Sequence, residues 1–150
     1  MEELNFLHVT KKELFYTAVM LQLRQLVNVV YDFPADENKF DQELSEARSS
    51  LRKKKLLTES ARSGINLSFT LILCAIFCAN PESCEVIDIN DYHATIYKVA
   101  SAYMLMERRS ENDLAAVWFA KREFLDEYIR ITANKIIISE KKEKINNGEA

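Results

Sequence analysis

The segment from Leu67 to Ala79 limits what this chain can fold into more than any other part of the sequence. It is mostly apolar and is followed directly by Asn80 and Pro81. A membrane-spanning helix needs about 20 apolar residues, more than this segment offers, and proline cannot continue a helical hydrogen-bond ladder. We therefore predict a core helix that ends near Ala79 and does not enter a membrane. Because it is apolar on nearly all sides, it is expected to lie between two other layers.

The length and composition favour one domain. The chain has 150 residues, of which 48% are hydrophobic and 29% are charged, values typical of a globular protein. It contains only two glycines and two prolines, which excludes phosphate-binding loops built from several glycines. We predict a single domain over residues 1–140 and a frayed polar tail over residues 141–150.

The first third of the chain predicts two capped helices. Thr10 and Glu13 have the spacing of a capping box, and the apolar residues that follow predict a helix from Lys11 to Leu26. Residues 27–33 are β-branched and aromatic, which fits a short strand or an extended link. Asp36 is expected to cap a second helix, whose apolar face is formed by Phe40, Leu44, Ala47 and Leu51. Residues 58–64 are turn-like.

The second half changes to strand patterns. Strands are predicted over residues 84–89, 92–99, 103–108 and 114–119, joined by turns into an antiparallel meander. A single helix from about Ala94 to Arg108 is an alternative. An amphipathic helix is expected from Arg122 to Ile131, and residues 136–138 either extend it or add an edge strand. These patterns predict an α+β fold, in which N-terminal helices pack on an antiparallel β-meander and a C-terminal helix closes the structure.

No residue pattern indicates catalysis, a cofactor or a bound metal. His93 and Asp91 could form an acid–base pair, although surface residues beside a turn are the simpler interpretation. The cysteines lack the further ligands that a tetrahedral metal site needs. Their odd number indicates a reducing compartment, and we expect buried free thiols at Cys74, Cys78 and Cys84. We therefore predict a cytoplasmic protein that is not an enzyme and needs no cofactor.

Two regions of the sequence are candidates for binding a partner. Interfaces are enriched in tyrosine, tryptophan and methionine, which makes these residues the predicted partner-binding set: Tyr103, Met104, Met106 and Trp118. If strands form here, Met104 and Met106 share one face of the sheet, while Tyr103 and Leu105 share the other. One face is expected to pack on the core helix, and the other is either open to a partner or covered within the fold.

The second region is the basic run at residues 52–55, which either complements a helix dipole or contacts phosphates. The net charge of the whole chain is −3, which gives nucleic-acid binding no general electrostatic help. We therefore expect no nucleic-acid partner in the leading hypothesis.

The order of these motifs resembles that of a known family. Residues 31–34 (Tyr-Asp-Phe-Pro) follow the first helix, a leucine–basic–leucine stretch spans residues 51–59, and the apolar helix ends in Pro81-Glu82 before the strands. From Leu14 to Ile129 the chain resembles the EspG-like chaperones of type VII (ESX) secretion and their shorter Firmicute relatives. The resemblance implies a bacterial, non-catalytic chaperone that binds a secretion substrate of helical-hairpin type.

The leading hypothesis is a chaperone or adaptor that caps an apolar helical surface of such a substrate, with the sheet that carries Met104, Met106 and Trp118. One alternative is a DNA-binding regulator with a winged-helix-like N-terminal half. Another is an interaction domain that forms homo-oligomers. Since an open sheet edge invites pairing, a homodimer is also expected.

Overall fold

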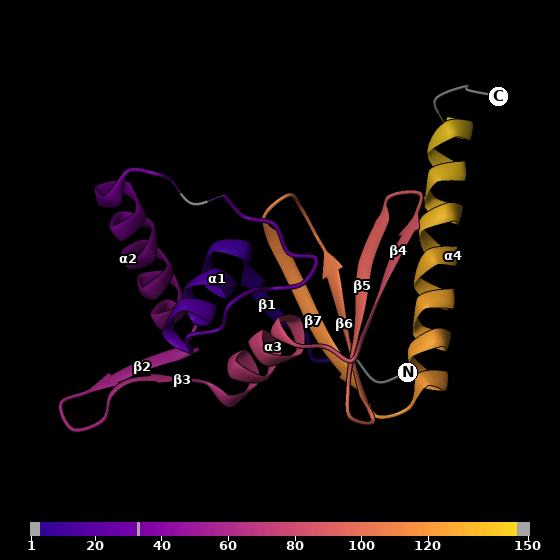
Figure 1. Cartoon of the computed structure of the whole chain (residues 1–150). Coiled ribbons are helices and arrows are strands. Elements are labelled where there is room, and N and C mark those ends of the chain that lie inside the picture. Colours follow the sequence, from indigo (N-terminus) through magenta and orange to yellow (C-terminus); the bar gives the residue numbers. More distant parts are fainter. Residues whose placement is uncertain (1–3, 33, 147–150) are drawn as a thin grey trace.

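The computed structural model describes residues 4–32 and 34–146, with side chains described as far as residue 136. Its main element is a five-stranded antiparallel sheet in the order β1-β7-β6-β5-β4. Helices lie on both faces of this sheet (Figure 1). The sheet is formed by β1 (Leu7–Thr10), β4 (Ser83–Ile89), β5 (Tyr92–Val99), β6 (Ala102–Arg108) and β7 (Asp113–Phe119). The predicted α+β fold is confirmed.

The predicted meander is confirmed as well. Strands β4 to β7 pair in chain order, and Ala94 faces Glu107 across β5 and β6 while Lys98 faces Tyr103. The alternative of one helix over residues 94–108 is therefore wrong. Strand β1 was not predicted. It pairs with β7, with Leu7 opposite Ala116 and Thr10 opposite Asp113.

Helix α1 (Lys11–Met20) begins as predicted but ends well before Leu26. Thr10 and Glu13 form the expected capping box. At the other end, Gln22 adopts a left-handed backbone conformation with φ 57°. Its N–H donates to the Val19 carbonyl, and the Leu23 N–H donates to the Ala18 carbonyl, which is the hydrogen-bond pattern of a Schellman motif. This motif turns the chain away, and residues 27–32 form a link rather than a strand.

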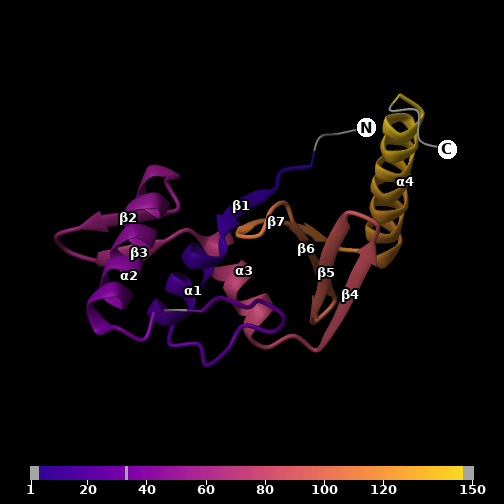
Figure 2. The same ribbon diagram turned by 90° about the horizontal axis from the view of Figure 1, so that it is seen from above.

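Helix α2 (Glu37–Lys53) is capped by Asp36, as predicted. Residues 58–64, which were expected to be a turn, instead form most of a hairpin between β2 (Leu57–Ser60) and β3 (Gly64–Leu67). Gly64 has a φ of 70°, a conformation that glycine adopts without strain. Figure 2 shows that α2 and this hairpin lie together, away from the five-stranded sheet.

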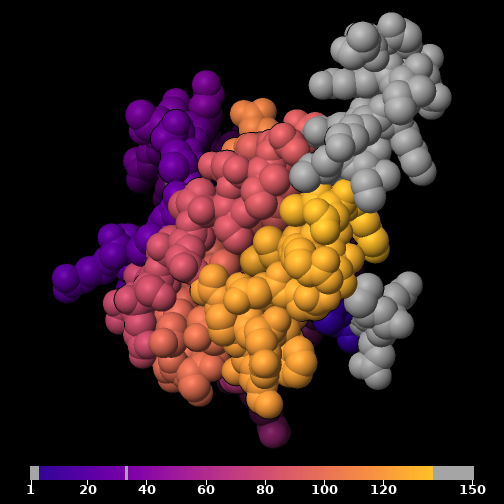
Figure 3. Space-filling model, turned by 90° about the vertical axis from the view of Figure 1, so that its right-hand side faces the viewer, coloured from indigo at the N-terminus to yellow at the C-terminus, as the bar shows by residue number. Residues whose placement is uncertain are grey.

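Helix α3 (Phe69–Ala79) is the predicted core helix and ends before Pro81. It packs with α1 on one face of the sheet, in a cluster that includes Leu14, Leu71, Cys74 and Met104. Helix α4 (Arg122–Asn146) packs on the other face, where Leu125 joins Ile96, Leu105 and Val117. Figure 3 shows α4, in orange and yellow, directly beside the pink and salmon segment of β4 and β5. The fold therefore has two apolar layers separated by the sheet.

Helix α4 also decides the alternatives left open for the C-terminal region. Residues 136–138 extend this helix and do not form an edge strand. The predicted frayed tail, residues 141–150, overlaps the last part of α4, and its final residues, 147–150, lie outside the described residues. Within the described ranges, no helix combines the length and apolarity that a membrane crossing requires.

Candidate functional site

The four residues predicted to bind a partner lie on both faces of the sheet. Met104 is 0% exposed and Met106 is 4% exposed, and both belong to the cluster under α1 and α3. Tyr103 is half-buried beside the cluster under α4. Of the two alternatives for the second face, open to a partner or covered within the fold, the structure has the second, because α4 covers the face that α1 and α3 leave free. Met106 lines a cavity.

Trp118 is half-buried on the same face as Met104. Its ring packs edge-on against Phe77 of α3, with 6.4 Å between ring centroids and an interplanar angle of 84°. The indole Nε1–H is buried and has no hydrogen-bond partner in the described part of the chain. Trp118 thus contributes to the contact between the sheet and α3.

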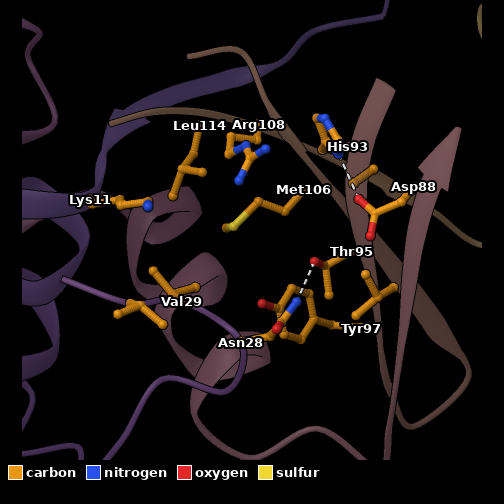
Figure 4. A pocket seen from close by; sticks show the side chains of 13 residues that line it. Lys11, Asn28, Val29, Asp88, His93, Thr95, Tyr97, Met106, Arg108 and Leu114 are labelled. Atoms are coloured by element: carbon orange, nitrogen blue, oxygen red, sulfur yellow. Dashed lines mark hydrogen bonds and ion pairs between the residues drawn. The ribbon is translucent and has the colours of Figure 1, made fainter. Parts of the chain in front are cut away.

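A cavity of about 300 Å³ lies between the link that follows α1 and strands β4, β5 and β6, in the half of the sheet near the turn that joins β4 to β5. We call it the groove (Figure 4). Met106, Val29 and Leu114 provide apolar surface within it, and all three are buried. Val86 of the edge strand β4 lines its rim and is exposed. The groove is therefore a recess with an apolar floor, and it opens beside the edge strand β4.

The link forms one wall of the groove, and hydrogen bonds hold this wall in place. The Val27 N–H donates to the Cys78 carbonyl of α3 at 2.7 Å, and the Val27 carbonyl accepts from the Tyr97 hydroxyl at 2.6 Å. Asn28 adopts a left-handed conformation with φ 60° and donates from Nδ2 to the Thr95 hydroxyl at 2.9 Å. Burial raises the pKa of Tyr97, so its hydroxyl remains a neutral donor. The wall is consequently held by both α3 and β5.

Charged side chains surround the apolar part of the groove. Lys11, at the start of α1, and Arg108, at the end of β6, point into it from two sides (Figure 4). On a third side, Asp88 Oδ1 lies 2.6 Å from His93 Nδ1. The sequence suggested Asp91 as the partner of His93, but β4 and β5 place Asp88 directly opposite His93. The groove therefore combines two cations with one acidic group that already has a partner.

A second surface lies on α3. Four large apolar residues repeat at helical spacing on one side of this helix: Phe69, Ile72, Leu73 and Ile76. We call them the α3 stripe. Phe69 is 76% exposed and Ile76 is 42% exposed, while Ile72 and Leu73 are partly buried. Because it is apolar on nearly all sides, this helix was expected to lie between two other layers. The stripe shows that one side of α3 is open. The helical spacing of its four residues can be read from the sequence, but their exposure cannot.

Glu107, the buried carboxylate under α4, is satisfied within the fold. It is 3% exposed and accepts hydrogen bonds from the hydroxyls of Tyr92 at 2.6 Å and Tyr128 at 2.9 Å. Arg109 pairs with its other oxygen at 2.6 Å. Because Tyr128 belongs to α4, this group joins the helix to the sheet. We assign Glu107 a structural role.

The three cysteines are free thiols. Cys74 and Cys78 are buried as predicted, and Cys84 is partly buried. The adjacent Cys74 thiol, together with burial, raises the pKa of Cys78 well above its ordinary value, which keeps it protonated and unreactive. Within the described residues, no three histidine, cysteine, aspartate or glutamate side chains come close enough together to hold a metal ion.

Comparison of the chain with protein-family models and with curated proteins finds no match. Two surfaces, the α3 stripe and the groove, and the motif order in the sequence are therefore the features that bear on function.

Proposed function

We propose that this chain is a non-enzymatic chaperone or adaptor that caps an apolar helical surface of a type VII-like secretion substrate in the bacterial cytoplasm. The observation that supports this most strongly is the α3 stripe. Its residues have the i, i+3, i+4, i+7 spacing with which one helix packs on another. Phe69 and Ile76 are large apolar side chains that the fold leaves exposed, and contiguous apolar surface of this kind is characteristic of interaction sites.

The motif order supports the same function from the sequence. The resemblance to EspG-like chaperones concerns proteins that bind helical-hairpin substrates without catalysis. The proposed contact differs from the one expected from sequence, since Met104 is fully buried and Met106 is reached only through the groove. The apolar cluster that buries them lies between the sheet and α3, and the outer side of α3 presents the apolar surface instead.

The proposal is tested by co-expressing the chain with small helical proteins encoded by neighbouring genes and measuring complex formation by size-exclusion chromatography and calorimetry. The double variant Phe69→Asp/Ile76→Asp places two charges on the stripe, and we expect it to weaken binding at least about tenfold. Aspartate at position 69 lies in the first turn of α3, where its negative charge interacts favourably with the helix dipole. Folding should therefore persist, as circular dichroism would verify.

The matched control is Phe124→Asp, which places the same charge at an exposed phenylalanine on α4, across the sheet. It should bind the helical protein as the unchanged chain does. Equal affinity of the stripe variant and of this control for the helical protein would refute the proposed surface.

Sedimentation analysis of the chain alone tests the expected homodimer. A dimer that dissociates in the stripe variant would assign the stripe to a second copy of this chain instead.

A DNA-binding regulator is the second candidate, and one observation favours it. The hairpin of β2 and β3 follows α2 directly, and the exposed cations Lys53, Lys55 and Arg62 have no ion-pair partner in the described part of the chain. Lys54, in contrast, pairs with Glu13. This function predicts a mobility shift of duplex DNA at low salt that is lost in Lys53→Glu/Lys55→Glu. The absence of any shift at low salt would exclude it.

A further inference from the structure

Two cations face the groove without a partner. Neither the Lys11 Nζ nor the Arg108 guanidinium has a hydrogen-bond or ion-pair partner among the described residues. Five other arginines are paired with carboxylates, namely Arg48, Arg52, Arg109, Arg122 and Arg130, whereas the exposed Arg24 and Arg62 have no such partner among the described residues. Lys11 and Arg108 are distinguished by their position, because both point into an apolar recess (Figure 4).

Strand register brings these two residues to the same end of the sheet. Leu114 of β7 lies between Val9 of β1 and Arg108 of β6. Lys11 follows β1 directly and is held there by the hydrogen bond from its backbone N–H to the Asn112 carbonyl at 2.9 Å. Neighbouring strands are about 4.8 Å apart. The long side chains of Lys11 and Arg108 can therefore reach one group bound above Leu114.

Among the described residues, no acidic side chain near the groove contacts these two cations. Asp88 lines the other side of the groove and pairs with His93. Glu107 precedes Arg108 in β6, but the alternation of a strand directs it to the opposite face of the sheet, where it binds Arg109. The charge at this end of the groove therefore remains positive.

We propose that the groove binds a carboxylate side chain of the protein partner. Lys11 and Arg108 pair with the carboxylate, and the surface formed by Val29, Met106 and Leu114 receives an aliphatic side chain next to it. Charge complementarity defines the occupant as an aspartate or glutamate. The apolar floor favours an acidic group carried by a protein segment over a fully hydrated inorganic anion. The identification of this partner as a secretion substrate rests on the proposed function.

The test uses the full chain labelled with nitrogen-15 and two probes, the amidated peptides acetyl-Leu-Glu-Leu and acetyl-Leu-Gln-Leu. Nuclear magnetic resonance detects binding at millimolar affinity through shifts of backbone amides. We expect saturable shifts at Val29, Thr95, Met106 and Leu114 with the glutamate peptide. The glutamine peptide should bind about tenfold more weakly, because it lacks the charge-assisted hydrogen bonds. Arg108→Gln should reduce binding of the glutamate peptide by a similar factor.

The control variant is Lys53→Gln, which removes an exposed and unpaired charge at the end of α2 and should leave peptide binding unchanged. Equal binding of the two peptides, shifts that map elsewhere, or no saturable shift would overturn the proposal. Inorganic phosphate that produces the same shifts at the same affinity would also overturn it, in favour of a simple anion site. Phe69→Asp/Ile76→Asp should retain peptide binding, so failure of the α3 stripe and failure of the groove give different results.

Discussion

Lys54, at the end of α2, forms an ion pair with Glu13 in the first turn of α1, with 2.5 Å between Nζ and Oε1. Glu13 is 1% exposed and also accepts hydrogen bonds from the Thr10 N–H and the Ser50 hydroxyl. One buried carboxylate thus caps α1 and joins it to α2. Lys54 belongs to the basic run at residues 52–55, which suggested phosphate binding in the sequence. In the structure this lysine forms an internal contact instead.

This arrangement predicts a large effect of Glu13→Ala on stability. The change leaves the Thr10 N–H without its side-chain acceptor, removes one of the two acceptors of the Ser50 hydroxyl and removes the ion-pair partner of Lys54. We expect the free energy of unfolding to fall by about 2–4 kcal/mol. Glu13→Gln keeps an acceptor oxygen in place and should cost less. Urea unfolding followed by circular dichroism measures both, and equal losses in the two variants would contradict this account.

The contact between Tyr128 and Glu107 predicts a stability loss at high pH. Burial, together with the charge of Glu107, raises the pKa of Tyr128 from 10.0 to about 12, and burial also raises that of Tyr31 to about 12. Because these phenols resist ionisation only in the folded state, their contribution to stability should be fully present below pH 10 and should be lost as the pH rises from 10 to 12.

The variant Tyr128→Phe separates this contribution. It removes one hydrogen bond to Glu107 and should cost about 1 kcal/mol at neutral pH. Its loss of stability between pH 10 and 12 should be smaller than that of the unchanged chain. Unfolding free energies measured at several pH values provide the comparison, and parallel curves for the two proteins would argue against the role of Tyr128.

The burial of Met104 predicts that Met104→Asp prevents stable folding. The change places a charge in the layer between the sheet and α3, at a cost of about 4 kcal/mol or more. Val30→Asp, in the exposed part of the link beside the groove, is the matched control. It should alter the free energy of unfolding by no more than about 0.5 kcal/mol. A cooperative thermal transition for Met104→Asp near that of the unchanged chain would contradict the structure.

The left-handed conformation of Gln22 predicts a stabilising substitution. A residue with a Cβ atom pays a steric cost at φ 57°, and glycine does not. After allowance for the greater freedom of glycine in the unfolded chain, Gln22→Gly should raise the free energy of unfolding by about 0.5–1 kcal/mol. Gln25→Gly, at an exposed position between α1 and the link and without positive φ, should not stabilise. Thermal unfolding of both variants tests the difference.

The local features of this fold could be predicted because their causes lie within a few residues. Thr10 and Asp36 cap helices through their own side chains, Pro81 follows the end of α3, and alternating residues define the strands of the meander. Strand β1 could not be predicted in the same way. It has only four residues, and its partner β7 lies at the other end of the chain. The early end of α1 was missed because its Schellman motif uses Gln22 in place of glycine.

The sequence by itself determined the kinds of elements and their order, since helical and strand periodicity and capping are local properties. Only the tertiary structure decided which surfaces remain open. Helices α1 and α3 cover the face that carries Met104, Met106 and Trp118, and α4 covers the other face, while one side of α3 stays exposed. Register across β1, β7 and β6 brings Lys11 and Arg108 together over Leu114. Such relationships depend on how distant segments pack, because burial and charge pairing are properties of the assembled layers.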